Sequence, residues 1–477
     1  MFPKDKEYDL IIVGGGLSGL TAAVSARDNG LKTLVLEKGR STGGGGNYVE
    51  GIMGVGSRMQ KENDIKIKPT EMLQSELQYS HYEANASHLK KFIDESGKVV
   101  DWLEDLGVKY VKVGKQGKSW PTIHSFEGGG ASAVKLLLEK AKEKGAEIVT
   151  STSVQHVLMH DGHVSGVIIK NEATGQNREL EAKNVILATG GYVDNPDLVK
   201  KRMDDDRLMS VSTGKSTGDG MKLAWEVGAK HASMGAIQYG GGAIYDKTRP
   251  QFVHMPEQLA AAATQEALLW VNERGERFVN EDVNDNMCHA GAAILTQSRT
   301  YSIMDRASID YWSEKGLYKE VGNSPFSPDT FDKLKGEIDR DLANHEKFLT
   351  KADTVEELAE KLNLPHLSET VNHYNSLVAK GEDTDFGKKK EYLHPVSGGP
   401  YYAVQLGVGM ACALGGIRVD NDNAVLNPEG YPLEGLYAVG NDAAGMIVGD
   451  TYAVTLPGST CGYACFSARN AVEKIAK

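Results

Sequence analysis

The chain opens with the sequence of a complete dinucleotide-binding βαβ unit, and this feature constrains the fold more than any other. An apolar run at 10–13 suits a buried parallel strand, a Gly-Gly-Gly-Leu-Ser-Gly turn occupies 14–19, and small residues predict a helix over 17–28. A second strand at 32–36 leads to Glu37. Because strand, turn, helix, strand and carboxylate follow in the right order, the segment predicts a site for an ADP-containing cofactor rather than an ordinary glycine-rich turn.

Each part of the turn has its own role in such a site. Gly14 permits the tight turn, Gly16 lets the backbone approach a pyrophosphate, and Gly19 allows close packing of helix on strand. The helix N-terminus, with Leu17 and Ser18, presents free N–H groups and a dipole that favours negative charge. A carboxylate after the second strand accepts hydrogen bonds from ribose hydroxyls and repels a 2′-phosphate, which argues against NADP.

Length and charge narrow the class of protein. A chain of 477 residues is long enough for two or three domains and for a core that encloses a large ligand. A net charge of −12 argues against a general nucleic-acid or anionic-membrane binder. We expect no bilayer span and no signal peptide, and therefore a cytoplasmic protein.

The cysteines do not form a recognisable binding motif. The four cysteines are Cys288, Cys412, Cys461 and Cys465, and no CxxC or CxxCH occurs among them. A zinc site, an attached c-type haem or a disulfide framework is therefore unsupported, and we predict no metal site.

Later segments decide between FAD and NAD. A glycine run at 43–46 follows Glu37 and can lie against a cofactor that extends past the ribose. Residues 147–169 alternate as in a β-meander, and an apolar strand at 184–187 runs into Ala-Thr-Gly-Gly at 188–191. This last motif resembles flavoproteins of the glutathione-reductase fold and favours FAD.

A second nucleotide site is a weaker possibility. Residues 128–133 fit GxGxxA and begin a helix that extends to about Lys144, but we expect no strand before them because 118–127 contains a proline and alternates poorly. The sequence thus predicts no separate pyridine-nucleotide domain.

Several motifs in order resemble the flavoprotein family of fumarate reductase and succinate dehydrogenase. The branch it resembles includes flavocytochrome c fumarate reductases, urocanate reductases and 3-ketosteroid Δ1-dehydrogenases. Beyond the N-terminal unit, the resemblance rests on residues 217–229, 271–281, 399–403, 414–420 and 435–441. It implies an α/β fold with a glutathione-reductase-type FAD-binding Rossmann domain, interrupted by an α+β capping domain.

The resemblance also implies domain limits and cofactor contacts. The FAD-binding domain would take 1–236 and 396–477, and the capping domain 237–395, where charged stretches at 331–349 and 353–381 look like solvated helices. The residues expected to touch FAD are Gly14, Gly16, Leu17, Ser18, Gly19, Glu37, Lys38, Gly43, Gly44, Gly45, Asn47, Val154, Ala188, Thr189, Gly190, Asp219, Asn441, Asp442, Ser459 and Thr460.

The chain departs from this family where fumarate reductases hold a dicarboxylate. Gly240 replaces a histidine, Asp285 an arginine, and Thr455 the C-terminal arginine, while Ala411 and Cys412 stand where histidines precede the Gly-Gly motif. Without these anchors two carboxylates lose their partners, at a cost of several kcal/mol. We therefore expect that fumarate and succinate are not substrates.

The resemblance to the ketosteroid branch supplies candidate catalytic residues. Tyr452 matches a tyrosine that polarises a ketone, and a phenol suits a neutral substrate because it donates a hydrogen bond without charge. Asp285 is a candidate proton-transfer group or a helix cap. Glu281 either pairs with Arg277 to stabilise the cap or lines a proton route, and Arg306 is a candidate substitute for the catalytic arginine.

Other candidate side chains have simpler explanations. His124 and His254 either face the pocket or are satisfied structural histidines, and Cys412 is most simply a small core residue. None of these side chains decides the substrate.

Two functions remain open at this stage. The preferred one is an FAD-dependent oxidoreductase that moves a hydride between flavin and an activated C–C bond, as an ene-reductase or a dehydrogenase. Its substrate would be a small neutral or monoanionic molecule, with enones and ketosteroid-like molecules as candidate classes, and an external electron donor or acceptor would complete the reaction. The alternative is a flavin-binding protein of the same fold with a lost or regulatory function.

Overall fold

The computed structural model describes residues 2–116, 119–231, 234–266, 268–319, 328 and 330–477. They form two compact units. Unit 1 comprises Met1–Met203, Ser212–Gln238 and Cys412–Lys477, and unit 2 comprises Asp204–Val211 and Tyr239–Ala411. Within the described residues, no helix has the length and apolar character needed to cross a bilayer.

Two of the four boundaries between the units fall inside strands. β11 (Ile237–Ile244) begins in unit 1, and β15 (Tyr401–Ala413) ends in it. Unit 2 thus extends to Ala411, whereas the sequence-based division ended the capping domain at 395. A continuous strand carries no turn signal that would mark such a boundary in sequence.

Unit 1 is built on an eight-stranded sheet in which the N-terminal unit is central. The strand order is β16-β17-β8-β9-β1-β2-β6, and β7 pairs with β8. β1 (Glu7–Val13) runs parallel to β2 (Thr33–Leu36) and to β9 (Asn177–Leu187). All of β2 and the last four residues of β1 are buried, as predicted for parallel strands covered on both faces. The other strands are β6 (Glu147–Val149), β7 (Thr152–His160), β8 (His163–Asn171), β16 (Ala424–Leu426) and β17 (Pro432–Ala438).

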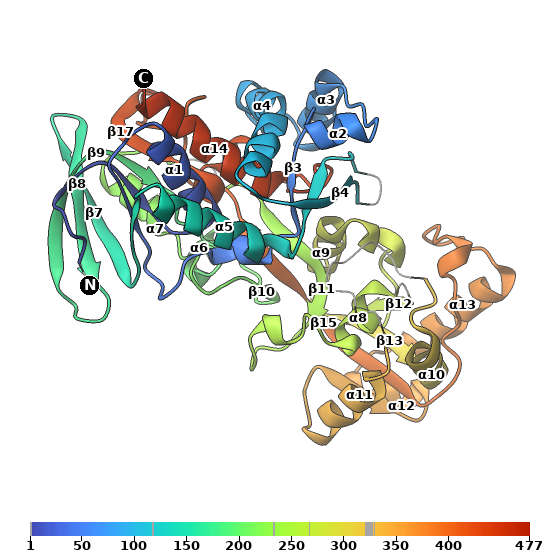
Figure 1. The fold of residues 1–477 in the computed structure, drawn as a ribbon. Coiled ribbons are helices and arrows are strands. Elements are labelled where there is room, and N and C mark those ends of the chain that lie inside the picture. The colour runs from blue at the N-terminus through green and yellow to red at the C-terminus, as the bar shows by residue number, and fades with distance from the viewer. Residues whose placement is uncertain (1, 117–118, 232–233, 267, 320–327, 329) are drawn as a thin grey trace. The chain divides into compact units, whose positions relative to one another are not determined.

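The helix of the βαβ unit is almost wholly buried. α1 (Leu17–Asp28) lies against α5 (Gly129–Glu143) and α14 (Ser459–Ile475) in unit 1 (Figure 1). Small residues make this close packing possible, and every residue of α1 from Leu17 to Ala26 is buried. The other helices of unit 1 are η1 (Gly44–Tyr48), α2 (Arg58–Glu62), α3 (Pro69–Tyr79), α4 (Ala86–Asp105), α6 (Pro196–Arg202), α7 (Asp219–Glu226), η5 (Gly440–Asp442) and η6 (Ala444–Met446).

A small antiparallel sheet corrects one prediction. β5 (Ile123–Phe126) directly precedes α5, so the expectation that no strand precedes this helix was wrong. β5 pairs antiparallel with β3 (Gly51–Met53) and with β4 (Tyr110–Gly114). Because these pairings are antiparallel, the segment is not a second parallel βαβ unit.

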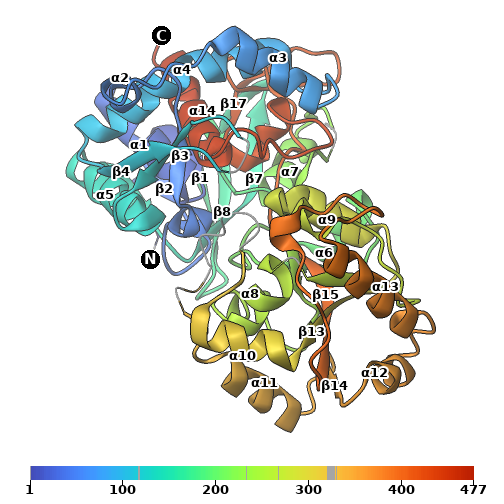
Figure 2. The same cartoon turned by 90° about the vertical axis from the view of Figure 1, so that its right-hand side faces the viewer.

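Unit 2 is a sheet with helices on both faces. The order is β10-β15-β13-β12, with β11 and β14 also paired to β15. Trp270, Met304 and Val404 share a buried cluster with α8, α10 and α11, whereas Leu269 and Ile303 pack with α12 and α13. Alternate strand residues thus serve opposite faces, and Figure 2 shows the two helix groups on either side of β13 and β15.

The predicted charged stretches are amphipathic helices of this layer. Their buried faces include Leu334 and Ile338 of α11, Leu358 of α12 and Val371 of α13, so these helices complete the core of unit 2. The elements of unit 2 besides β11 and β15 are β10 (Leu208–Ser210), η2 (Gln251–Val253), α8 (Gln258–Gln265), β12 (Leu269–Asn272), η3 (Glu281–Asp285), α9 (Met287–Leu295), β13 (Thr300–Asp305), α10 (Arg306–Lys315), α11 (Leu334–Ala343), β14 (Leu349–Ala352), α12 (Val355–Leu362), α13 (Leu367–Lys380) and η4 (Lys390–Tyr392).

Candidate functional site

The glycines of the first turn leave no room for side chains at two positions. A Cβ added to Gly14, whose φ is 112°, would lie 2.2 Å from the Ala188 carbonyl oxygen, and one added to Gly19 would lie 1.9 Å from the Gly14 oxygen. At Gly16, by contrast, the nearest atom to an added Cβ is the Gly43 oxygen at 3.8 Å. Gly14 and Gly19 are therefore required by packing, while Gly16 leaves the backbone open at the N-terminus of α1.

The second glycine loop lies directly beside the first. The Gly43 N–H donates to the Gly15 carbonyl oxygen at 2.8 Å, and Gly16 and Gly43 form a parallel bridge. An added Cβ at Gly45 would meet nothing within 4 Å, whereas Gly43 is covered by the side chain of Asn47. The two loops thus place exposed backbone next to the α1 N-terminus, where Leu17 and Ser18 begin the helix.

Glu37 is held at the end of β2 by neutral donors. Its carboxylate accepts the Gly15 N–H at 2.9 Å and the Gly39 N–H at 2.6 Å, and its side chain is 7% exposed. The backbone of Glu37 also pairs with Val149 and Thr152, which brings β7, with Val154, next to the first βαβ unit.

The Ala188–Gly191 segment is joined to the C-terminal part of unit 1 by a buried carboxyl group. Asp442 accepts the Thr189 N–H at 2.6 Å and the Gly191 N–H at 2.9 Å, and it also bonds the Thr189 hydroxyl. Burial raises the pKa of Asp442. Asn441 donates to the Gly190 carbonyl oxygen at 3.4 Å, so segments about 250 residues apart are joined just beyond the carboxyl ends of β9 and β17.

Lys38 and Asp219 form a half-buried ion pair in unit 1. Lys38 Nζ contacts Asp219 Oδ2 at 2.6 Å and the Thr217 hydroxyl at 2.6 Å. Lys38 follows Glu37 directly, and Asp219 is the first residue of α7. The pair therefore ties the loop after β2 to the start of α7.

The candidate tyrosine, Tyr452, precedes α14 in the chain and contacts the first turn of this helix. Ser459 and Thr460 begin this helix, and Gly458 precedes it with a left-handed φ of 81°. The hydroxyl groups of Tyr452 and Thr460 are 2.6 Å apart and hydrogen bonded. Tyr452 is 9% exposed, and the neutral hydroxyl group of Thr460 fixes the position of its phenol.

These residues fit the cofactor that the sequence predicts. A bare helix N-terminus, glycines against which an extended ligand can lie, and a carboxylate fixed at the end of β2 match the phosphates and ribose of an ADP group. The glycine loop at 43–46 continues beyond Glu37, as a flavin dinucleotide requires.

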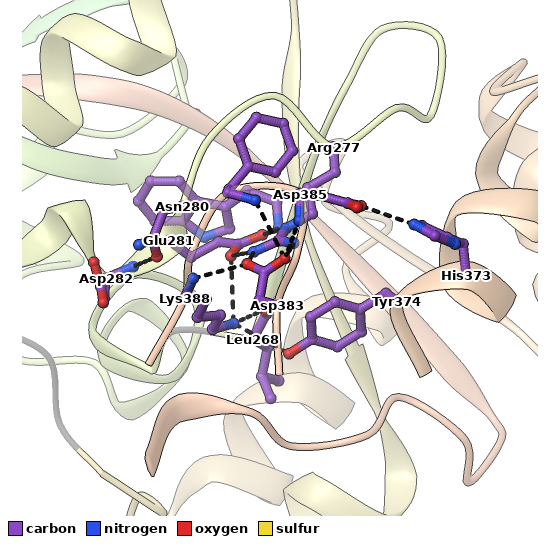
Figure 3. Close-up of polar contacts among 12 residues, drawn as sticks. Leu268, Arg277, Asn280, Glu281, Asp282, His373, Tyr374, Asp383, Asp385 and Lys388 are labelled. Carbon is purple, nitrogen blue, oxygen red and sulfur yellow. Dashed lines mark hydrogen bonds and ion pairs between the residues drawn. The ribbon is translucent and has the colours of Figure 1, made fainter. Parts of the chain in front are cut away.

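The candidate Glu281 lies in a buried ion cluster of unit 2 (Figure 3). Arg277 binds Glu281 and Asp383 in a bidentate manner, with N–O distances of 2.8–3.0 Å. Lys388 Nζ lies 3.3 Å from Glu281 Oε2 and 3.1 Å from the Tyr374 hydroxyl. The pKa of Asp383 is held well below its usual range by Arg277 and by backbone N–H groups, although burial opposes this shift.

This cluster joins three segments of unit 2 by side-chain contacts: 277–281, α13 with Tyr374, and 383–388. Glu281 and Lys388 have fully buried side chains, and burial lowers the pKa of Lys388. The sequence predicted the pairing of Arg277 with Glu281 but missed Asp383 and Lys388. No periodic signal marks Asp383, and Lys388 begins a Lys-Lys-Lys run that is typical of solvated surface.

The other two catalytic candidates lie in different settings. Asp285 is the last residue of η3, next to the α9 cap Asn286. Arg306 begins α10 and pairs with Asp310 at 2.9 Å, with both side chains over 40% exposed. This placement gives Arg306 an ordinary surface partner, and neither residue is part of the Glu281 cluster.

The two histidines are satisfied inside their own units. His124 bonds the Ser57 hydroxyl at 2.7 Å and the Thr122 carbonyl at 3.0 Å, and burial lowers its pKa. His254 lies between Glu257 and Asp246, at 2.6 and 3.0 Å. Both side chains are 2% exposed or less. Within the described part of the chain, no group of three or more His, Cys, Asp or Glu side chains is arranged so that it could hold a metal ion.

Comparison with known proteins identifies the family. A family model described as an FAD binding domain matches residues 9–452. The chain belongs to this FAD binding domain family. Vinyl phenol reductase of Lactiplantibacillus plantarum is 41% identical over 482 aligned residues, which cover 99% of this chain and 97% of that protein. NADH:fumarate oxidoreductase of Klebsiella pneumoniae is 27% identical, and the match covers 92% of this chain but only 45% of that protein.

A solved structure shows the same fold. The crystal structure of 3-ketosteroid Δ1-dehydrogenase from Sterolibacterium denitrificans matches with a TM-score of 0.79 and 19% identity, over 99% of this chain and 100% of that one. The predicted α/β fold class and the resemblance to the fumarate reductase and ketosteroid dehydrogenase family are thereby confirmed.

FAD is the cofactor of this family, and the chain is an FAD-dependent oxidoreductase acting on carbon–carbon double bonds. At 19% identity the 3-ketosteroid Δ1-dehydrogenase structure shows the fold alone, whereas the relative with 41% identity is named a vinyl phenol reductase.

Proposed function

We propose that the chain is an ene-reductase for a neutral alkene conjugated to a hydroxylated aromatic ring, as in a vinyl phenol. The observation that carries the proposal is the full-length match to vinyl phenol reductase at 41% identity. Such a substrate falls within the neutral class that the sequence predicts. The enone and ketosteroid classes have only the more distant likenesses in their support.

The residues at the anchor positions of the fumarate reductases support a neutral substrate. An added Cβ at Gly240 would meet nothing closer than the Gly409 carbonyl oxygen at 3.6 Å, so this position offers space rather than a cation. Cys412 bonds the Gln238 side chain at 3.2 Å, and the Thr455 hydroxyl bonds Glu76. A dicarboxylate would lose several kcal/mol in such surroundings.

The cofactor assignments of individual residues are part of this proposal. We assign the phosphate groups to the turn from Gly14 to Gly19, the ribose to Glu37, and the rest of the cofactor to the glycine loop at 43–46 and the segments around Thr189 and Asp442. Unit 2 is assigned as the capping domain. When bound and reduced by the external donor, the flavin would supply a hydride, and the second hydrogen would reach the substrate as a proton.

Tyr452 of unit 1 is the proposed polar contact for the substrate. Its hydroxyl is fixed by Thr460 at 2.6 Å, and a phenol in this position can donate a hydrogen bond to a neutral oxygen without adding charge. The electrons come from an external donor, since the only nucleotide-binding βαβ unit among the described residues is assigned to FAD.

The test is product formation by the FAD-loaded protein. The protein would be supplied anaerobically with a chemical reductant and given 4-vinylphenol, an enone or fumarate in parallel, with the products separated by chromatography. We expect 4-ethylphenol and no succinate. Full FAD occupancy with no product from any acceptor would contradict the proposal and favour the alternative of a flavin-binding protein without catalysis.

A further inference from the structure

A carboxyl group lies on the apolar face of α3. The buried residues of this helix are Met72, Glu76 and Leu77, so Glu76 shares a face with Met72 one turn earlier. Its side chain is 3% exposed. A buried carboxyl group on an apolar helix face is costly to stability and marks a position with another role.

Glu76 is paired with a hydroxyl group instead of a cation. The Thr455 hydroxyl donates to Glu76 Oε1. Burial raises the pKa of Glu76 to about 7, and the hydrogen bond from Thr455 opposes this shift. Residues 76 and 455 are 379 positions apart in the sequence, so the pair exists only in the folded unit.

The segment that carries Thr455 is fixed by further bonds. The Thr455 carbonyl oxygen accepts the Trp120 N–H at 3.0 Å, and the Pro457 carbonyl oxygen accepts the Thr122 hydroxyl at 3.0 Å. Tyr452 and Thr460 form their own hydroxyl pair on either side of this stretch. Thr455 is half-buried, whereas its partner Glu76 is buried.

We infer that Thr455 and Glu76 form a specificity-determining pair that binds the neutral hydroxyl group of the substrate and rejects a carboxylate in the same place. This inference rests on the proposed function and names Thr455 and Glu76 as the residues that distinguish the substrate from a carboxylate. Because the hydrogen of Thr455 is directed to Glu76, the free lone pairs of Thr455 accept a hydrogen from a phenol. A carboxylate has no hydrogen to donate, and ionised Glu76 repels it.

The charged groups that flank the pair along the two segments are exposed. On α3, Glu71 pairs with Lys68, and both side chains are more than half exposed. At the far ends of the two segments, His81 pairs with Asp450 at 3.0 Å, and Glu83 packs beside Gly449. Solvent screens these groups, so Glu76 itself is the group whose ionisation changes the charge beside Thr455.

The test is ligand affinity and not turnover, so it remains informative if the proposed reaction fails. The oxidised, FAD-loaded protein is titrated with 4-vinylphenol and with 4-vinylbenzoate, which carries a carboxylate in place of the hydroxyl group, and binding is followed by the flavin absorption. We expect 4-vinylphenol to bind at least 10-fold more tightly. Between pH 6 and 8 the preference should rise as Glu76 ionises.

Variants of the pair separate its two roles. Glu76→Gln should reduce the preference for 4-vinylphenol at least 10-fold and abolish its rise with pH. Thr455→Val should weaken 4-vinylphenol binding about 10-fold, and Thr455→Ser should restore it. Glu71→Gln, on the exposed face of the same helix, is the matched control and should change neither ligand.

Two results would overturn the inference. The first is an unchanged preference in both Glu76→Gln and Thr455→Val, and the second is a wild-type protein that binds 4-vinylbenzoate as tightly as 4-vinylphenol. If Glu76→Gln fails to fold, the Thr455→Val and Thr455→Ser comparison decides. Failure to reduce 4-vinylphenol despite the expected affinities would contradict the proposed function and leave the pair supported.

Discussion

Two sets of buried carboxyl groups, one in each unit, are stabilised in different ways. In unit 1, Glu37, Glu76 and Asp442 bond to backbone N–H groups and hydroxyls. In unit 2, Glu281 and Asp383 are neutralised by Arg277, with Lys388 beside them. Neutral partners leave a carboxyl group able to respond to a ligand or a proton, whereas a bidentate cation fixes its charge. The three unit 1 groups can therefore respond to a ligand or a proton, whereas the Arg277 cluster of unit 2 has a structural role.

Removing the cation of unit 2 should have the largest effect. Arg277→Gln leaves two buried carboxylates without their partner, and we expect a loss of about 3–5 kcal/mol in the unfolding free energy. Chemical denaturation followed by tryptophan fluorescence measures it, since Trp270 and Trp312 lie in the core of unit 2. A loss below about 1 kcal/mol would mean that the cluster stabilises unit 2 no more than an exposed ion pair does.

The carboxyl group of Glu76 should make stability depend on pH. Native Glu76 keeps its proton up to about pH 7, while in the unfolded chain the same group ionises near the ordinary glutamate pKa of 4.5. The native state thus binds more protons between these values, so stability falls as pH rises, by about 3 kcal/mol in total.

Comparison of the wild type with Glu76→Gln isolates this contribution. The stability difference between the two proteins should change across pH 4.5 to 7 and become constant above that range. A difference that does not vary with pH would show that Glu76 ionises normally.

The glycine turn should control the affinity for FAD through close packing and not through charge. Gly14→Ala places a Cβ 2.2 Å from the Ala188 oxygen at a φ of 112°. We expect FAD to bind roughly 100-fold more weakly, because such strain costs of order 1–3 kcal/mol. Gly114→Ala, where an added Cβ meets nothing within 4 Å, should bind FAD normally.

The hydroxyl pair of Tyr452 and Thr460 tests a neutral contact. Tyr452→Phe removes the hydroxyl group and should lower turnover roughly 10-fold or more, on the order of 1.4 kcal/mol, while FAD stays bound. Steady-state kinetics together with the flavin spectrum measure both effects. Unchanged kinetics would eliminate the proposed role of Tyr452.

The exposed ion pair between Arg306 and Asp310 in unit 2 should contribute least to stability. Arg306→Gln breaks the contact with Asp310, whose side chain is 43% exposed, and such pairs contribute about 0.2–1 kcal/mol. We expect a small change in denaturation midpoint and normal turnover. A large loss of turnover with stability intact would restore Arg306 as a catalytic candidate.

The sequence predicted local elements well because their signals are local. The helix at 17–28 has the predicted bounds, and the strand predicted at 32–36 begins one residue later, at Thr33. Glu37 was predicted at the end of β2 because strand and carboxylate are adjacent in the chain.

Contacts between segments that are distant in the chain could not be predicted from the sequence patterns. The bonds of Glu76 to Thr455 and of Arg277 to Asp383 join residues 379 and 106 positions apart. Neither Glu76 nor Lys388 has a neighbour in sequence that reveals its burial. The strand β5 was missed because it is short and follows a proline-containing segment.

The proposed reaction of the protein is the reduction of a neutral, hydroxylated alkene and not of a dicarboxylate. The direct measurement is the rate of flavin reoxidation after the anaerobically reduced, FAD-loaded protein is mixed with 4-vinylphenol or with fumarate in a stopped-flow instrument. The account predicts rapid reoxidation by 4-vinylphenol and none above background by fumarate. Rapid reoxidation by fumarate, with 4-vinylphenol inert, would contradict it.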